Sequence, residues 1–395
     1  MQITVVGQGY VGLPLAIAAC QSGYTVYGFD NDGEKVALLK SGKSIIEDLS
    51  NEVVKKSVHS KKYLPTVDQS VISDSEVVLI CVPTPLSNEH RPDLDALKSA
   101  TATVGKNLKA GSLVIVESTI EPGTCRNILL PSLLKESGLK PNEFELAYSP
   151  ERIDPTNKKW GISNTPKLVA GLTENAARQA GAFYGKFIDL ITVCSSLEIA
   201  ETAKLLENSF RLVNISFINE IAIFCQKIGI DVIEVISAAA TKPYGFMPFY
   251  PSVGAGGHCI PVDPIYLANS AKAVGAPSRF IELADQINQE MPGYFVGRAE
   301  EKLGSLKAKK VLVVGISYKP NIADVRESPA AALISGLKQK GAHVSWHDDL
   351  VKDWNGEKSV ALSNGFDLVI LATPHDYLDL TKLGKVPILN TRGSI

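Results

Sequence analysis

The sequence has no excess of one charge sign, no paired-cysteine motif and no long apolar run, and each absence excludes a class of protein. Its 395 residues include 40 Lys and Arg against 42 Asp and Glu, a formal net charge of −2. That balance gives no reason to expect a nucleic-acid partner. No uninterrupted apolar stretch approaches the roughly 20 residues that a membrane helix needs. We therefore expect neither nucleic-acid nor membrane binding.

Cysteine usage and length narrow the class further. The six cysteines are spread along the chain without CxxC spacing, which fits reduced thiols and neither a metal site nor a disulfide framework. Met1 runs almost directly into an apolar strand, so no signal peptide is predicted. A chain of this length is too long for one core. The sequence thus predicts a cytoplasmic protein of two or three domains without a bound metal.

The first 30 residues carry a dinucleotide-binding pattern. A buried strand at 3–6 leads into a Gly-x-Gly-x-x-Gly turn and a helix, and a second strand at 25–29 ends in Asp30. An acid at that distance would bind the adenosine ribose and repel a 2′-phosphate, which favours NAD over NADP. The alternative is a glycine-rich turn without a ligand. The residues expected at the cofactor are Gly7, Gly9, Tyr10, Val11, Gly12 and Asp30.

Three more predicted strands, at 77–82, 113–117 and 145–148, end in polar residues. The carboxyl ends of parallel strands meet at one edge of a sheet, where ligands bind. For Thr84 and Thr119 a helix cap or turn is an equally good interpretation. The residues that this edge would present are Pro83, Thr84, Thr119, Glu151 and Arg152.

A long amphipathic helix is predicted in the middle of the chain. No glycine or proline occurs between 186 and 228, and apolar residues recur every three or four positions. Such a helix often links two domains and packs against another copy. Lys204, Asn208 and Arg211 form one polar line beside the apolar stripe. That line is either a solvated face or part of a site, in which Lys204 could act as a base or stabilise an oxyanion.

A glycine-rich loop at 254–263 presents a single thiol, Cys259, followed by Asp263. Beside a nucleotide-binding domain this pattern indicates a nucleophile, although a buried cysteine next to a tight turn fits it too. His258 could hold a thiolate or simply bond to the backbone. The preceding stretch, 241–251, has three prolines and four aromatic residues, and its Phe249 and Tyr250 either stack on a ligand or pack the loop.

An α/β pattern begins again near residue 310 and continues to the end of the sequence. It predicts strands at 310–314, 343–346 and 367–372 and a helix at 330–340. Lys319 and Arg326 follow the first of these strands, where they could meet phosphates or be ordinary surface charges. The fold class is therefore α/β, with two Rossmann-like doubly wound domains joined by a central helical domain that is built on the long helix.

These motifs together resemble the UDP-glucose/GDP-mannose dehydrogenase family of nucleotide-sugar 6-dehydrogenases over nearly the whole chain. The matching segments are 7–12, 118–119, 149–152, 204–208, 256–263 and 319–329. The stretches 242–251 and 256–261 are most similar to the UDP-N-acetylglucosamine 6-dehydrogenase branch. One departure is Pro-Ser-Val-Gly at 251–254, where that branch usually has Pro-Gly-Pro-Gly.

The resemblance implies an NAD domain at 1–190, a central helical domain with the cysteine loop at 191–298, and a UDP-sugar domain at 299–395. It implies a homodimer formed through the long helix and a four-electron oxidation at C6 of a UDP-N-acetylhexosamine. Cys259 would carry the substrate first as a thiohemiacetal and then as a thioester. The product would be a precursor of a surface polysaccharide. The implied catalytic residues are Cys259, Lys204, Asp263, Glu151, Asn208 and Thr119. Arg326 would join the cofactor set. The implied substrate-binding residues are Glu151, Arg152, Lys204, Asn208, Arg211, Phe249, Tyr250, Gly256 and Lys319.

Other functions remain open. UDP-glucose or UDP-N-acetylmannosamine could be the substrate instead. A two-electron hydroxyacid dehydrogenase shares the Rossmann start and the Lys-x-x-x-Asn helix, but it would need neither Cys259 nor a third domain. A non-catalytic NAD sensor would need no nucleophile at all.

Overall fold

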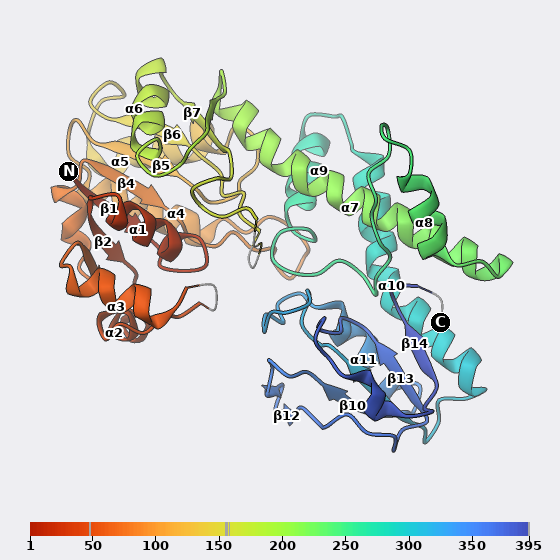
Figure 1. Cartoon of the computed structure of the whole chain (residues 1–395). Coiled ribbons are helices and arrows are strands. Elements are labelled where there is room, and N and C mark those ends of the chain that lie inside the picture. Colours follow the sequence, from red (N-terminus) through yellow and green to blue (C-terminus); the bar gives the residue numbers. More distant parts are fainter. Residues whose placement is uncertain (47–48, 155–156, 158, 394–395) are drawn as a thin grey trace. The chain divides into compact units, whose positions relative to one another are not determined.

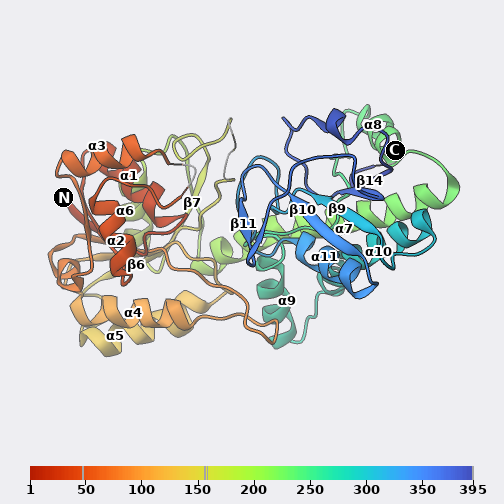
Figure 2. The ribbon, with the colours of Figure 1, turned by 90° about the horizontal axis from the view of Figure 1, so that it is seen from below.

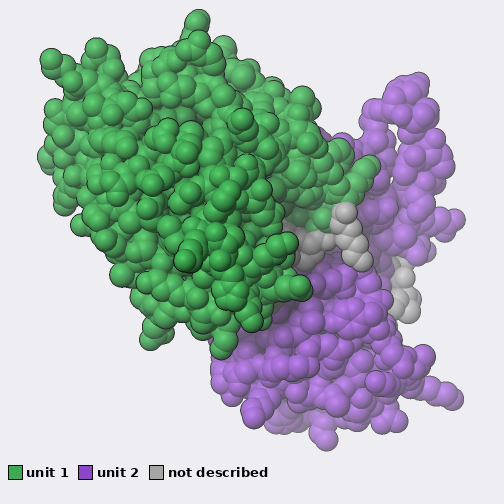
Figure 3. All heavy atoms as spheres, turned by 60° about the vertical axis from the view of Figure 1, so that its left-hand side comes forward, with its two compact units in different colours: residues 1–206 green, residues 207–395 purple. Residues whose placement is uncertain are grey.

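The structure is a computed structural model, and it describes residues 1–46, 49–154, 157 and 159–393 (Figure 1). The chain divides into two compact units, Met1–Leu206 and Glu207–Ile395, coloured separately in Figure 3. Helix α7 (Leu197–Ile228) contributes residues to both. The predicted three-way division at 190 and 298 stays a prediction.

The first unit is built on an eight-stranded sheet in the order β3-β2-β1-β4-β5-β6-β7-β8. All neighbours are parallel except β6 and β7, which are antiparallel. The order steps outward from β1 in both directions, so the strand order reverses between β1 and β4, where doubly wound sheets bind ligands. The strands are β1 (Gln2–Val6), β2 (Thr25–Phe29), β3 (Tyr63–Thr66), β4 (Val77–Ile80), β5 (Leu113–Val116), β6 (Glu145–Tyr148), β7 (Lys167–Gly171) and β8 (Ile191–Val193).

Helices cover this sheet because its central strands are apolar on both faces. All four residues of β4 and of β5 are buried, as expected for parallel strands covered on both sides. Helices α4 and α5 lie side by side (Figure 2). The helices are α1 (Gly12–Gln21), α2 (Gly33–Lys40), α3 (Asn51–His59), α4 (Asp95–Asn107), α5 (Leu130–Ser137) and α6 (Glu174–Tyr184), with short turns η1 (Gln69–Asp74) and η2 (Cys125–Leu129).

The second unit combines helices with a smaller parallel sheet in the order β10-β9-β13-β14. The reversal lies between β9 and β13, so its topology repeats the middle of the first sheet. Its elements are α8 (Val232–Ala240), α9 (Asp263–Ala273), α10 (Arg279–Leu303), β9 (Lys310–Val314), α11 (Pro329–Gln339), β10 (His343–His347), β11 (Asp353–Trp354), β12 (Glu357–Lys358), β13 (Leu368–Leu371), η3 (Leu380–Leu383) and β14 (Ile388–Asn390). The predicted fold class, two Rossmann-like sheets with a helical part built on a long helix, is confirmed.

Candidate active site

The Gly-x-Gly-x-x-Gly turn lies between β1 and α1 with the geometry that a bound dinucleotide needs. A Cβ at Gly12 would lie 1.9 Å from the Gly7 carbonyl oxygen, so the helix and turn could not pack as they do with any larger residue. Gly7 has φ +90°, in the region that favours glycine. A Cβ at Gly9 would meet no heavy atom within 4 Å, which leaves its backbone open to a pyrophosphate. Tyr10 is exposed at the same turn.

Asp30 lies at the end of β2, where its carboxylate is fixed in place. Its Oδ2 accepts a hydrogen bond from the Gln8 backbone N–H at 2.8 Å and lies 3.1 Å from the Lys35 ammonium. A cofactor ribose would therefore meet a carboxylate already held beside the glycine turn. This arrangement of open backbone and fixed acid fits NAD.

The ends of β4 and β5 are joined by side-chain hydrogen bonds. The Thr84 hydroxyl donates to the Thr119 carbonyl at 2.8 Å, and the Ser118 hydroxyl donates to the Val82 carbonyl at 2.7 Å. The Thr84 hydroxyl therefore ties two loops together. Thr119 is half-buried and Pro83 is exposed at the same edge.

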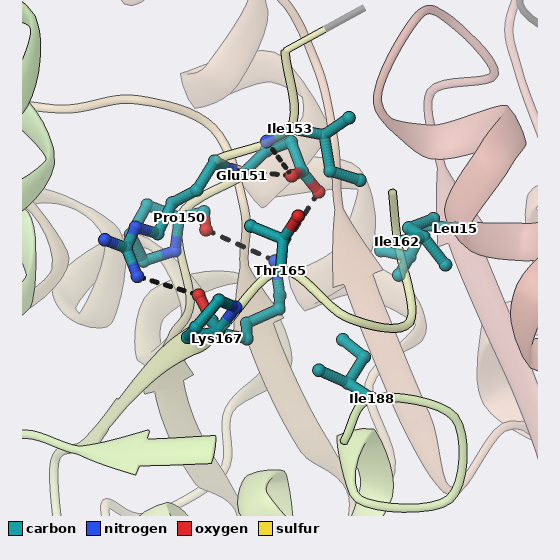
Figure 4. A pocket seen from close by; sticks show the side chains of 10 residues that line it. Leu15, Pro150, Glu151, Ile153, Ile162, Thr165, Lys167 and Ile188 are labelled. Carbon is teal, nitrogen blue, oxygen red and sulfur yellow. Dashed lines mark hydrogen bonds and ion pairs between the residues drawn. The ribbon is translucent and has the colours of Figure 1, made fainter. Parts of the chain in front are cut away.

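Glu151 follows β6, and its backbone surroundings fix its orientation. Its Oε1 accepts the backbone N–H groups of Arg152 and Ile153 at 2.6 and 2.7 Å. Its Oε2 lies 3.6 Å from the Lys167 ammonium. Figure 4 shows Glu151 lining a pocket with Lys167 and Thr165. Arg152 donates to the Pro166 carbonyl at 2.7 Å, so it positions that loop.

Helix α7 carries Lys204 and Asn208 one turn apart, and both are buried. The solvated-face interpretation is therefore wrong for these two residues. Arg211, at the end of the same polar line, is exposed. Asn208 donates a 2.6 Å hydrogen bond to Asp263, the first residue of α9. The carboxylate predicted from the loop and the amide predicted from the helix are thus in direct contact.

The glycine loop packs tightly against the segment between β9 and α11. A Cβ at Gly256 would lie 2.5 Å from the Glu327 carbonyl, and one at Gly257 would lie 2.6 Å from the Tyr318 ring. Gly257 also has φ +84° and donates to the Arg326 carbonyl at 3.2 Å. Only glycine fits these positions, so the loop conformation depends on them.

Cys259 is exposed, whereas the other five cysteines are buried or half-buried. This excludes the buried-cysteine interpretation. Its carbonyl accepts the Asp263 backbone N–H at 2.9 Å, so thiol and carboxylate share one helical turn. Burial, together with the Arg326 guanidinium, lowers the pKa of His258. The imidazole beside the thiol is therefore neutral near pH 7 and supplies no positive charge to a thiolate.

The remaining predicted ligand residues differ in how they are held. Arg326 makes a two-pronged ion pair with Asp324, with a shortest distance of 2.6 Å, and Lys319 is half-buried. The Phe249 ring packs edge-on against Phe210, with 5.8 Å between ring centroids. This supports the packing interpretation for Phe249, whereas Tyr250 is 54% exposed and available for stacking.

Three buried charged residues near these sites were missed from the sequence. Glu117 and Lys167 form a buried ion pair of 2.7 Å in the first unit. Glu201, on α7, accepts the backbone N–H groups of Gly123 and Cys125 at 2.5 and 3.0 Å. The sequence signal for such a residue is a charge at the edge of an apolar run, as at Glu117 directly after the apolar strand β5.

Comparison with known proteins places this geometry in a family. Family models match residues 1–188 as the NAD-binding domain, 198–290 as the central domain and 312–392 as the UDP-binding domain of the UDP-glucose/GDP-mannose dehydrogenase family. The chain belongs to this family. It is an NAD-dependent nucleotide-sugar 6-dehydrogenase.

Individual relatives cover almost the full chain. UDP-N-acetyl-D-glucosamine 6-dehydrogenase of Pseudomonas aeruginosa is 34% identical over 98% of this chain and 94% of its own. The structure of a UDP-D-ManNAc dehydrogenase from Pyrococcus horikoshii has a TM-score of 0.92 at 33% identity, covering 99% and 95% of the two chains. That of a UDP-glucose dehydrogenase from Pyrobaculum islandicum has a TM-score of 0.91 at 26% identity, covering 99% and 94%.

In the part of the chain that the structure describes, no helix combines the length and apolarity needed to cross a membrane.

Proposed function

We propose that this dehydrogenase oxidises C6 of a UDP-N-acetylhexosamine, UDP-N-acetylglucosamine first among them, from alcohol to carboxylate. The proposal is carried by the exposed Cys259 thiol, presented by the glycine loop one turn before the buried Asp263. A two-electron alcohol dehydrogenase needs no such nucleophile, whereas a four-electron oxidation needs a group that holds the substrate between its two steps. The names of the relatives refer to N-acetylglucosamine, N-acetylmannosamine and glucose nucleotides. The choice of UDP-N-acetylglucosamine among these sugars is therefore part of our proposal.

The residues of the chain divide the reaction into stages. Lys204 and Asp263 hold the water or side chain that accepts the C6 hydroxyl proton. The Cys259 thiolate then attacks the aldehyde carbon, and Lys204 and Asn208 stabilise the oxyanion of the thiohemiacetal. Bound NAD supplies the hydride-accepting chemistry at both oxidation steps. Water positioned by Glu151, Thr119 and Asp263 attacks the resulting thioester, and the Cys259 thiolate leaves as the uronate forms.

The cofactor would lie along the glycine turn. Gly9 leaves open space for the pyrophosphate, and Asp30 accepts hydrogen bonds from the adenosine ribose. Pro83, Thr84 and Thr119 at the strand ends, with Arg326, complete the proposed cofactor set. Lys319 would contact the UDP phosphates, and Tyr250 with Arg152 would contact the rest of the substrate.

We further propose a homodimer formed through α7. Phe210, Phe217 and Phe224 are seven residues apart and lie on one side of the helix. All three are about half exposed, at 46%, 57% and 56%. Isolated apolar residues on a surface are ordinary, but a continuous stripe indicates an interaction surface. A second copy of α7 presents the same stripe, as a two-fold interface requires.

The substrate test uses purified protein, NAD and four sugars: UDP-glucose, UDP-N-acetylglucosamine, UDP-N-acetylgalactosamine and UDP-N-acetylmannosamine. NADH formation ranks the sugars, and two NADH per sugar consumed support the four-electron reaction. One NADH per sugar would instead support the hydroxyacid dehydrogenase type. Cys259→Ala should abolish turnover and spare NAD binding. The matched control is Cys194→Ala, which replaces a half-buried cysteine outside the glycine loop.

A further inference from the structure

A lysine in the first unit lies between two carboxylates, and one of these is the proposed hydrolytic residue. The Lys167 ammonium is 2.7 Å from Glu117 and 3.6 Å from Glu151, and it also donates to the Pro150 carbonyl at 3.2 Å. Glu117 follows β5 and Lys167 begins β7, so the sheet itself brings the pair together. Figure 4 shows Lys167 and Glu151 lining the same pocket.

Exposure falls along this chain of charges. The side chains of Glu151, Lys167 and Glu117 are 18%, 6% and 0% exposed. Glu151 and Lys167 therefore line the pocket, and Glu151 is the more exposed of the two, while Glu117 lies beneath them. Glu151 Oε1 accepts hydrogen bonds from two backbone N–H groups. The other carboxylate oxygen, Oε2, faces the Lys167 ammonium, which therefore orients it.

The groups around the lysine favour its charged form. Burial disfavours the ammonium, but Glu117 and Glu151 outweigh burial and raise the pKa of Lys167. Burial also raises the pKa of Glu117 to about 7, against the opposing effect of Lys167. The other groups facing the pair are the Tyr184 hydroxyl, which donates to Glu117, and the buried Cys81 thiol. Lys167 is the single cation among them.

A purely structural role accounts poorly for this arrangement. A buried ion pair is often no more stabilising than apolar residues of similar size. A second carboxylate on the same lysine adds to the desolvation that one ammonium must offset. The arrangement is explained if the carboxylate at the pocket has a task there.

We propose that Lys167 is a positioning residue for thioester hydrolysis, which directs the Glu151 carboxylate into the pocket, and that Glu117 holds Lys167 in place. This inference rests on the proposed function, in which Glu151 orients the attacking water.

The test compares four variants by the pH dependence of kcat. In Lys167→Met the acid limb should move up by about one pH unit, because an opposite charge nearby typically stabilises a carboxylate by that much or more. Lys167→Arg should restore the limb toward the wild-type position. Glu117→Gln keeps the ammonium, so its limb should stay in place or move to lower pH. Glu117→Gln with Lys167→Met removes both buried charges together, so it tests the ammonium without leaving Glu117 unpaired.

A second measurement follows the acyl-enzyme directly. Slowed hydrolysis should make the Cys259 thioester accumulate, so acid-quenched Lys167→Met and the double variant should carry the uronyl adduct by intact mass, with a burst of two NADH per site. The control is Lys135→Met, at an 83% exposed lysine of the same unit, which should match the wild type. If both Glu117→Gln and Lys167→Met move the acid limb upward, if neither moves it, or if no adduct accumulates, the inference is overturned.

Failure of the proposed function would look different. The wild-type protein would then form no NADH from any UDP-sugar, or only one per sugar, and no wild-type adduct could be trapped at Cys259. A wild type that forms two NADH per sugar, combined with unchanged variants, overturns the role of Lys167 alone.

Discussion

Exchanging the two residues of the Asn208–Asp263 contact separates their effect on catalysis from their effect on the stability of the fold. The two side chains are buried and joined by a 2.6 Å hydrogen bond between amide and carboxylate. Asn208→Asp would place two carboxylates at that distance, which costs about 6 kcal/mol at an effective dielectric constant of about 20. Protonating one ordinary carboxyl at pH 7 costs about 4 kcal/mol. We therefore expect the variant to take up a proton and to lose about 4 kcal/mol of stability at pH 7.

The sign of the pH dependence follows from that proton. The folded variant binds one proton more than the unfolded chain, so its stability falls as pH rises above about 4 and recovers as pH falls. The slope is about 1.4 kcal/mol per pH unit. Asp263→Asn keeps an amide–amide hydrogen bond and should cost only about 1 kcal/mol. It also loses a carboxylate in the first turn of α9, which contributes up to about 1 kcal/mol.

The double exchange Asn208→Asp with Asp263→Asn restores one amide facing one carboxylate. Its stability should return to within about 2 kcal/mol of the wild type. Its kcat should stay at least about 100-fold low, because the carboxylate now stands on α7 rather than in the helical turn that carries Cys259. Guanidinium unfolding midpoints at two pH values and kcat for NADH formation measure the two effects.

The control is Asn214→Asp, on the same helix, whose side chain bonds only to the Phe210 carbonyl among the contacts described for it. It should change neither quantity appreciably. Full activity in the double exchange, or an Asn208→Asp variant whose stability ignores pH, would refute the reasoning.

Three further outcomes are expected. Gly9→Ala should fold normally but bind NAD at least about tenfold more weakly. Gly12→Ala should instead lower the melting temperature, because its Cβ would lie 1.9 Å from the Gly7 carbonyl oxygen. Equal NAD affinities for Gly9→Ala and the wild type would contradict this prediction. Asp30→Ala should raise the KM for NAD far more than the KM for the sugar, as initial rates would show. Phe217→Glu should give a monomer in sedimentation velocity if α7 forms the dimer, and a variant that stays dimeric would exclude this face.

Local patterns were sufficient to predict much of the fold. The strand, glycine turn, helix and Asp30 lie within 30 residues, and each has its own chemical signature, so β1, α1 and β2 were found within a residue or two. Helix α10 runs from Arg279 to Leu303 with Pro292 inside it, which a local pattern does not predict. Proline disfavours a helix interior, and here the packing of Met291 and Phe295 into the second core prevails.

Contacts between distant segments could not be predicted in the same way. Asn208 and Asp263 are 55 residues apart, and Lys167 and Glu117 are 50 apart. In neither pair does the sequence around one residue indicate which distant residue it contacts. For Lys167 the obstacle was greater, because β7 runs antiparallel to β6, and this reversal is what brings a lysine at the start of β7 to the ends of β5 and β6. Sequence spacing in an all-parallel sheet would have placed it at the opposite edge.

Glu201 shows why such hidden charges bear on the site. It lies on α7 three residues before Lys204, and its carboxylate caps the backbone after the Thr119 loop by accepting from Gly123 and Cys125. Burial raises its pKa, while those two N–H groups oppose the rise. A buried carboxylate with two donors is costly to replace. The helix that presents Lys204 and the loop that presents Thr119 are therefore anchored to each other by one side chain within the first unit. A change at Glu201 would thus disturb both of these proposed catalytic residues.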